Sequence, residues 1–412
     1  MNLFVLVWSF LKAKRINTLL HVVLLSLGIG VVVILLLFQK QVDATIARNT
    51  KGIDLVVGAK GSPLQLILCN VLHADFPTGN IKLHEAEAVA KLGMVKQAIP
   101  LALGDSYQNF RVVGTTRAYP QLYQIKLKVG HWWQNEFEVV VGSGVAANLS
   151  LKVGSTFISA HGLSDEGHAH DTHHFTVVGV LESSGSVLDN LILTDIISVW
   201  EMHAEHQEEG ADVDSLVQPS TLIAGADAAD TTREITSLLI QYRGPMAALR
   251  LPRSINTETN MQAASPAFEV SRLFTLLGFG REVLLSFSVI IIAISALSIF
   301  IGLYNSLQER QYDLAMMRVM GASKMKILSA ILLEGIMMTL MAMLLGFVLG
   351  HLGMGLCSTL FTGSQTIHFS LTTFYIDEVW VALIGLTLGF ICSWLPAIKA
   401  YRINIHQTLS QS

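Results

Sequence analysis

Long runs of apolar residues occupy four places in the 412-residue chain. A helix that crosses a bilayer needs roughly 20 such residues, at 1.5 Å of rise each. The first run is too long for the apolar core of a signal peptide, so we interpret it as a retained anchor. The four runs predict membrane-spanning helices at residues 19–40, 281–304, 327–352 and 379–395, the last of them ended by Pro396.

The pattern changes between the first and second runs. Residues 41–280 alternate short strand-like stretches, such as Ile53–Val57 and Phe175–Leu181, with helix-like ones, such as His84–Leu92 and an amphipathic stretch over Thr231–Tyr242. Such alternation predicts an α+β domain, with a β-rich subdomain at about 105–215. The predicted fold class is therefore an α-helical membrane protein with four transmembrane helices (one plus three) and an α+β extracytoplasmic domain between the first two.

Basic residues predict how the chain is oriented. They precede the first span at residues 12–15 and lie in the connection 305–326 and in the tail 396–412, whereas the loop 353–378 contains no lysine or arginine. Cytoplasmic flanks carry the excess of basic residues. We therefore expect both termini in the cytoplasm of a bacterium, the chain in its inner membrane, and residues 41–280 in the periplasm.

The first 18 residues combine an apolar stripe with a basic end. This pattern is typical of a helix that lies at the cytoplasmic membrane face in contact with lipids. A frayed lead-in to the first span explains it equally well.

Composition restricts the possible functions. Only 14% of residues are charged, against about a quarter in soluble domains, so part of the chain belongs in lipid. Residues 41–280 hold 16 basic and 25 acidic residues, a balance that disfavours nucleic acid as a partner. The cysteines Cys69, Cys357 and Cys392 form neither a disulfide framework nor a zinc-ribbon pattern.

The sequence also bears on energy supply. It contains no GxxxxGK[ST] phosphate loop, and the run from Gly58 to Pro63 is better explained as a glycine turn. Any ATP must therefore bind to another chain. We find no credible nucleophile–base pair, so we predict no catalytic residue in this one.

The connection 305–326 predicts a short amphipathic helix. With helical spacing, Leu314, Met317 and Met320/Gly321 share one face, and Arg310, Asp313 and Arg318 lie elsewhere. Gly321 is placed to end the helix. Periodicity alone leaves open whether this helix is a lever for a partner or a solvated connector.

The same connection carries a family resemblance. Its pattern E-R-x-x-D-L-A-x-M-R-x-x-G-A resembles the FtsX/MacB permeases, the type VII or mechanotransmission ABC transporters. Val139–Gly154 and Val177–Leu181 resemble the family's periplasmic β-rich subdomain, and Pro396–Ile403 resembles its closing motif, which departs from the usual ending at Asn404. The order of one span, an outer domain and three spans matches as well.

The resemblance implies a mechanism and partners. A cytoplasmic ABC ATPase, carrying the ATP and magnesium, would receive the connecting helix in a groove. A second permease copy or a paralogue would complete the membrane part, and a periplasmic client or adaptor would be handled outside the membrane. The residues implied in ATPase coupling are Glu309, Arg310, Asp313, Leu314, Met317, Arg318 and Gly321.

Two features of the third span stand out. Glu334 is an acid in an otherwise apolar run, and we interpret it as a structural group that hydrogen-bonds between helices. Gly346 and Gly350 form a GxxxG pair, which permits close helix packing.

A histidine-rich loop is the one feature that the resemblance does not require. Imidazole and carboxylate groups at this density can bind zinc or another transition metal. Weak adventitious binding and a plain solvated loop remain open. The candidate ligands are His161, His168, His170, Asp171, His173 and His174.

Three functions compete at this stage. The first is a permease subunit acting on a periplasmic or membrane-extracted client: a lipoprotein, lipid, peptide, drug or metal-binding protein. The second is an FtsX-like signalling subunit that regulates a periplasmic cell-wall hydrolase. The third, a membrane-anchored metal sensor, is disfavoured because three spans follow the sensor domain.

Overall fold

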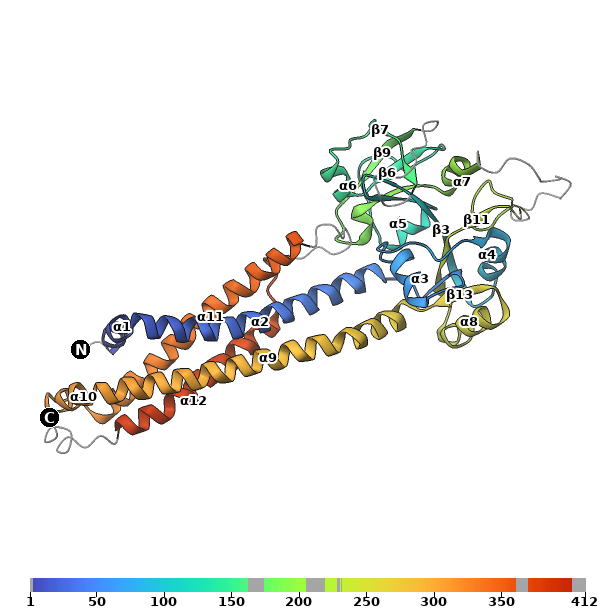
Figure 1. Cartoon of the computed structure of the whole chain (residues 1–412). Coiled ribbons are helices and arrows are strands. Elements are labelled where there is room, and N and C mark those ends of the chain that lie inside the picture. The colour runs from blue at the N-terminus through green and yellow to red at the C-terminus, as the bar shows by residue number, and fades with distance from the viewer. Residues whose placement is uncertain are drawn as a thin grey trace. The chain divides into compact units, whose positions relative to one another are not determined.

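The computed structural model describes residues 3–161, 174–204, 219–227, 230, 232–360 and 370–401, and Figure 1 shows the whole chain. The chain divides into two compact units. Of the described residues, those in 3–42, 277–360 and 370–401 form the membrane unit, and those in 43–276 form the α+β unit. The boundary between residues 42 and 43 falls inside the continuous helix α2 (Arg15–Asn49). The boundary between residues 276 and 277 falls inside the continuous helix α9 (Pro266–Glu309).

Within the described residues, four helices are long and apolar enough to cross a membrane, which confirms the predicted four-span fold class. They are α2, α9, α11 (Lys324–Leu360) and α12 (Ile376–Tyr401). A shorter helix, α1 (Leu3–Ala13), precedes them and buries Val7 and Leu11 in the membrane unit's core. The N-terminal segment is thus a packed helix and not a frayed lead-in.

The predicted end of the fourth span at Pro396 is wrong. Helix α12 continues through this proline to Tyr401. Proline removes one helical hydrogen bond and crowds the preceding turn, which usually breaks or kinks a helix. Here the turn beyond it is held by packing, because Ala397 and Ala400 are buried against Leu307 and Ile327.

Small residues bring the membrane helices close together. A Cβ atom added to Gly346 of α11 would lie 2.9 Å from Cβ of Ile29 and 3.0 Å from the carbonyl oxygen of Ser26, both in α2. A Cβ atom added to Gly350 would likewise crowd the side chain of Val33 in α2. The predicted GxxxG pair therefore forms the contact of α11 with α2, where only glycine is small enough to fit.

The α+β unit is built on a large mixed sheet. Among the described residues, eleven strands join it in the order β13-β1-β12-β3-β4-β10-β6-β9-β5, with β7 on β9 and β8 on β3; β2 and β11 form a separate pair. The strands are β1 Leu55–Ala59, β2 Ile81–Lys82, β3 Val95–Tyr107, β4 Phe110–Thr115, β5 Leu127–Gly130, β6 Glu138–Val141, β7 Thr156–Phe157, β8 Ala160–His161, β9 Phe175–Leu181, β10 Leu191–Asp195, β11 Glu234–Ile235, β12 Ser237–Tyr242 and β13 Met261–Ala264.

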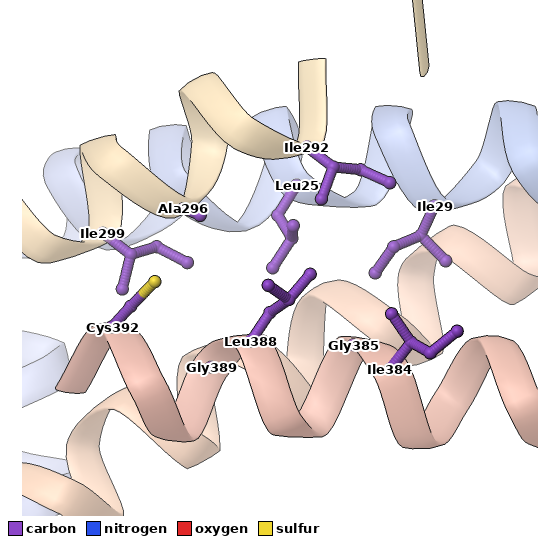
Figure 2. Close-up of a pocket in the computed structure, with 10 residues that line it drawn as sticks. All are labelled: Leu25, Ile29, Ile292, Ala296, Ile299, Ile384, Gly385, Leu388, Gly389 and Cys392. Atoms are coloured by element: carbon purple, nitrogen blue, oxygen red, sulfur yellow. The ribbon is translucent and has the colours of Figure 1, made fainter. Parts of the chain in front are cut away.

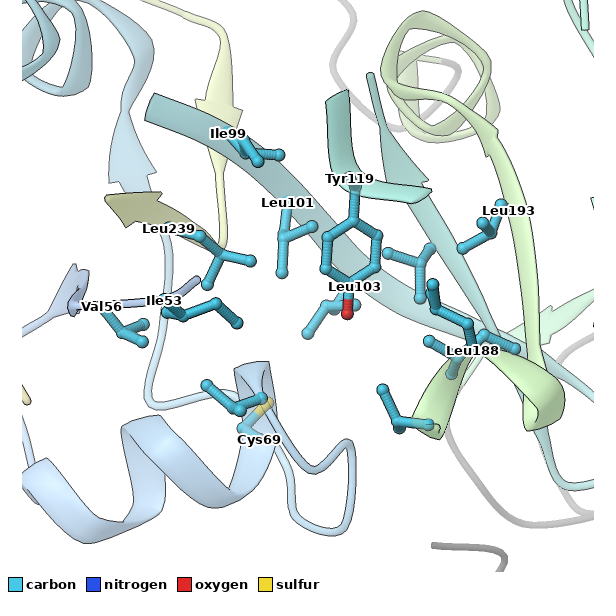
Figure 3. Packing of buried hydrophobic residues seen from close by; sticks show 14 of the residues in the cluster. Ile53, Val56, Cys69, Ile99, Leu101, Leu103, Tyr119, Leu188, Leu193 and Leu239 are labelled. Carbon is cyan, nitrogen blue, oxygen red and sulfur yellow. The ribbon is translucent and has the colours of Figure 1, made fainter. Parts of the chain in front are cut away.

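Helices cover both faces of this sheet. Helix α3 contributes Leu66 and Ile67 to the core on one face, part of which Figure 3 shows. Helices α4, α7 and α8 contribute to the core on the other face. The helices of the unit are α3 Pro63–Asn70, α4 Leu83–Ala90, α5 Ala118–Leu122, α6 Ser143–Asn148, α7 Ile196–Ala204 and α8 Pro245–Glu258, with a 3₁₀ turn η1 at Val187–Asn190.

The amphipathic helix predicted over residues 231–242 is wrong, because β11 and β12 lie there. Alternate residues of β12 enter different cores: Leu239 packs on the α3 side, and Leu238 and Ile240 pack on the other. A strand that is buried on both faces reads as a continuous apolar run, which periodicity cannot separate from a helix.

Candidate functional site

The strongest candidate site lies where α9 turns into α10 (Gln311–Val319). The helical path breaks at Arg310, whose backbone has φ −102° and ψ 11°. Helix α10 ends at Val319, and the predicted cap residue Gly321 follows directly after the C-cap Met320, with φ 101°. The amides of Gly321 and Ala322 donate to the carbonyl oxygens of Arg318 and Met317, both at 3.0 Å. This pair of bonds is a Schellman cap, which favours glycine at the left-handed position.

One face of α10 is packed. Leu314 is buried against α9, α11 and α12, Met317 is partly covered by the same cluster, and Ala315 is also buried. The packing partners of this cluster are Leu307, Ile327, Ile331, Ala397 and Ala400. The helix is therefore held on three membrane helices and is not a loose connector.

The other face of α10 exposes apolar side chains. Val319 is 60% and Met320 75% exposed, and Tyr312 and Met316 continue the same stripe at helical spacing. We call Tyr312, Met316, Val319 and Met320 the α10 stripe. The sequence prediction placed Leu314, Met317 and Met320 on one shared face; the structure separates them, because Leu314 is buried and Met320 is exposed. The i, i+4, i+7, i+8 spacing of the stripe was the signal that could have found it.

One of the predicted coupling residues, Arg310, contacts the predicted intramembrane residue Glu334. Nη1 of Arg310 lies 3.8 Å from Oε1 of Glu334 in α11, and these side chains are only 13% and 9% exposed. Nη2 of Arg310 donates to the carbonyl oxygen of Phe10 at 3.3 Å, and the guanidinium stacks over the Phe10 ring at 4.2 Å. Glu309 forms an ion pair with Lys14.

The remaining predicted coupling residues are less informative. Arg318 is partly buried and engaged in contacts. For Asp313 only the backbone, within α10, is described.

A second polar cluster lies at the other end of α11. Nδ1 of His351 is 2.8 Å from the carbonyl oxygen of Leu371, and Nε2 is 3.1 Å from Oε2 of Glu378. The Gln41 side chain bonds both the amide and the carbonyl of Ser370, at 2.7 and 2.9 Å. These contacts tie the segment before α12 to α11 and α2.

The interior of the membrane unit contains a small apolar cavity (Figure 2). Its volume is about 30 Å³, and it lies among α2, α9 and α12. A dry cavity of this size holds no polar substrate. Its lining is Leu25, Ile29, Ile292, Ala296, Ile299, Ile384, Gly385, Leu388, Gly389 and Cys392.

Most of the predicted metal ligands, His168, His170, Asp171 and His173, lie outside the described residues. Of the other two, His161 ends β8, whose backbone pairs with β3 at Asp105, and His174 is exposed just before β9. Among the residues that the structure describes, no three histidine, cysteine, aspartate or glutamate side chains gather into a metal-binding group.

The sequence missed a buried polar cluster beside α3. Arg111 donates to Sγ of Cys69 at 3.6 Å, and Nε2 of His73 lies 2.9 Å from the hydroxyl of Tyr119. Burial, with a smaller contribution from the charge of Arg111, lowers the pKa of His73 to about 3. Burial also raises the pKa of the Cys69 thiol. Both groups lie buried beside the core on the α3 side of the sheet.

A second missed group is Glu87 of α4, which holds residues 220–222. Its carboxylate accepts hydrogen bonds from Thr221 Oγ1 at 2.6 Å, from the Leu222 amide at 3.0 Å and from the Ser220 hydroxyl. Burial alone would raise the pKa of Glu87, but these hydrogen bonds outweigh it and lower the pKa.

Comparison with known proteins identifies the two parts of the chain. Residues 18–238 match the family model of the MacB-like periplasmic core domain, and residues 285–405 match that of the FtsX-like permease C-terminal domain. The lipoprotein-releasing system transmembrane protein LolC of Neisseria meningitidis is 22% identical over 66% of this chain. The matched region covers 65% of that relative's length.

Two solved structures are also similar. The periplasmic region of MacB from Actinobacillus actinomycetemcomitans is 12% identical, with a TM-score of 0.33, over 55% of this chain and 97% of that one. The extracellular domain of YknZ from Gram-positive bacteria is 11% identical, with a TM-score of 0.30, over 52% of this chain and 99% of that one. The first family model alone covers more than half of the chain. The chain is thus an inner-membrane protein that belongs to the MacB/FtsX family of ABC transporter permeases.

Proposed function

We propose that this chain is the transmembrane subunit of an ABC transporter in which α10 docks on a cytoplasmic ATPase. The observation that carries the proposal is the α10 stripe, an apolar face on a helix whose opposite face is already packed. A helix of this kind is suited to a groove on a partner. In this arrangement the ATP and magnesium belong to the partner, and both termini of this chain are cytoplasmic.

The motion produced by the ATPase would reach the α+β unit through two helices. Helices α2 and α9 run without interruption through the division between the membrane unit and the α+β unit. A continuous helix keeps its backbone hydrogen bonds and transmits displacement along its axis. This continuity supports coupling of ATP hydrolysis to a conformational change outside the cytoplasm.

The client would be periplasmic or extracted from the membrane. The small apolar cavity of the membrane unit disfavours a polar conduit among α2, α9 and α12. The name of the relative LolC refers to lipoprotein release. A lipid-modified client is therefore the first class to test, ahead of the peptides, drugs and metal-binding proteins that the sequence also permits.

A second permease copy or a paralogue would complete the membrane part. The outward face of α9 is apolar and exposed in the single chain. Lipid covers such a face as readily as protein does, so the proposal needs its own test: the mass of the detergent-solubilised complex. The exposed residues include Phe287, Ile290, Ile294 and Leu297.

The decisive experiment is recovery of the ATPase. The tagged chain is purified in mild detergent from native membranes, and the eluate is assayed for ATP hydrolysis. We expect the triple variant Met316→Ser, Val319→Ser, Met320→Ser to lose the ATPase that the wild type recovers, because polar groups weaken an apolar interface. Met246→Ser with Leu249→Ser, an exposed apolar pair on α8, is the matched control.

Other outcomes of this experiment are also informative. Failure to recover an ATPase in several detergents, with and without nucleotide, would show the docking proposal to be wrong. A cell-wall hydrolase that copurifies with the ATPase would favour the FtsX-like signalling function over transport.

We also propose that the histidine-rich loop binds zinc or another transition metal. The support is the sequence alone, with four histidines among residues 168–174. Calorimetric titration of the full chain with zinc should show one tight site. Asparagine at His168, His170, His173 and His174 should remove it, while asparagine at the exposed His84 and His131 should not. Equal heats from both variants would indicate adventitious binding.

A further inference from the structure

Two breaks in the helical path of the membrane unit meet each other. Lys14 separates α1 from α2, and Arg310 separates α9 from α10. These residues are 296 positions apart in the chain, yet Lys14 pairs with Glu309 and Arg310 contacts Phe10. The break at Lys14 is therefore held by Glu309, and the break at Arg310 is held by Phe10 of α1.

Arg310 joins three elements at this point. It lies at the start of α10, bonds the carbonyl oxygen and covers the ring of Phe10 in α1, and pairs with Glu334 in α11. Its planar guanidinium can stack and donate several hydrogen bonds at once, which a lysine ammonium cannot do in the same way. With 13% of its side chain exposed, Arg310 is occupied within this chain and presents little surface to a partner.

The charges at this site balance. Two acids, Glu309 and Glu334, face two bases, Lys14 and Arg310. In the Lys14–Glu309 pair the Glu309 side chain is 63% exposed, so solvent weakens that pair, whereas the Arg310–Glu334 pair is largely buried. Removal of one partner from a buried pair leaves an uncompensated charge, so the second pair determines whether the bend stays in place.

We propose that Arg310 is a positioning residue that locks α1, α10 and α11 into one lever, so that displacement of α10 by the ATPase moves α1 and α11 with it. This inference rests on the proposed docking of an ATPase on α10. It assigns to α1 a part in coupling, and to Glu334 a role in transmission in addition to helix packing.

The first test needs no ATPase. Hydrogen exchange is measured on the full chain in lipid nanodiscs for the wild type, Arg310→Met and Glu334→Gln. Both variants should speed exchange about tenfold or more in α10 and also in α1, because both helices lose the shared contact. Lys326→Met, which removes an exposed cation from the first turn of α11, is the control and should change neither helix. Unchanged protection of α1 in Arg310→Met would overturn the proposal.

The second test measures coupling in the reconstituted complex. Arg310→Met should retain the bound ATPase, because the α10 stripe is intact, but its turnover should fall toward that of the ATPase alone. The exchanged pair Arg310→Glu with Glu334→Arg should recover part of the coupling, which also shows that the fold tolerates the change. Wild-type turnover in Arg310→Met would overturn the proposal. A wild-type chain that recovers no ATPase would instead refute the docking function and leave the exchange test standing.

Discussion

The membrane unit and the α+β unit hold their cores together by different means. In the α+β unit, large apolar residues fill both faces of a sheet, and buried polar groups such as Glu87, Thr115 and Ser237 are hydrogen-bonded within the unit. In the membrane unit, glycines bring helices into close contact, and polar side chains gather near the two ends of α11, at Glu334 and at His351. Water drives the first kind of packing, whereas in lipid shape and hydrogen bonding must suffice.

The largest expected effect on stability comes from shortening one of two matched leucines. Leu101 in β3 and Leu37 in α2 are both fully buried. Leu101→Ala should lower the free energy of unfolding of the α+β unit by about 2–5 kcal/mol, from lost transfer free energy plus a cavity. Leu37→Ala should lower the stability of the membrane unit by less, because lipid is as apolar as the core. Pulse proteolysis of the full chain, read out fragment by fragment, measures both, and equal losses would contradict the comparison.

The close packing of α2 on α11 is the next feature to break. Gly346→Leu forces its side chain against Ile29 and should destabilise the membrane unit by about 1–3 kcal/mol or more through overpacking. Gly278→Leu, in α9, is the matched control, since nothing lies within 4 Å of a Cβ added there. Thermal unfolding in detergent distinguishes the two. A similar melting temperature for both variants would show that the glycine contact is not needed.

Glu87 tests the hydrogen-bonded packing of the α+β unit. Glu87→Gln removes acceptor capacity from a buried site and should cost about 1–3 kcal/mol. Hydrogen exchange of α4 and of residues 219–227 in the full chain reports the loss. Glu85→Gln, two residues away in the same helix and partly exposed, should leave exchange unchanged.

The same carboxylate predicts a pH dependence. Because the folded pKa of Glu87 is lowered, its stabilisation is fully present above the unfolded value of about 4.3 and is lost as the pH falls through the lower folded value. Protection of residues 219–227 should therefore decline as the pH drops below about 4.3. The decline should be smaller in Glu87→Gln, and an equal decline in both proteins would assign it to other groups.

The smallest expected effect concerns the cap of α10. Gly321 has φ 101°, and alanine there should cost about 1–2 kcal/mol. The last turn of α10 should exchange faster, with a modest loss of ATPase binding because Val319 and Met320 lie in that turn. Ala322→Ser leaves the cap intact and serves as the control. Normal exchange in Gly321→Ala would show that the cap is dispensable.

Much of the architecture could be predicted from local patterns. The four spans, the α+β class, the helix at 311–319 and its glycine cap all follow from run length, periodicity and the conformational freedom of glycine. The predictions are wrong where burial in the tertiary structure, which a local pattern does not record, decides the secondary structure. Strand β12 is covered on both faces, and α12 passes through Pro396 because Ala397 and Ala400 are packed.

The candidate site shows the same division most clearly. The sequence by itself determined that a short helix joins the second and third spans, and that charged residues surround it. Two apolar stripes on that helix are equivalent by periodicity, and only contacts with Leu307, Ile327 and Ala397 decide that Leu314 is buried and Met320 exposed. Likewise, only the folded bundle brings Phe10 and Glu334 to Arg310, because a pairing between distant segments depends on helix packing that no local pattern records.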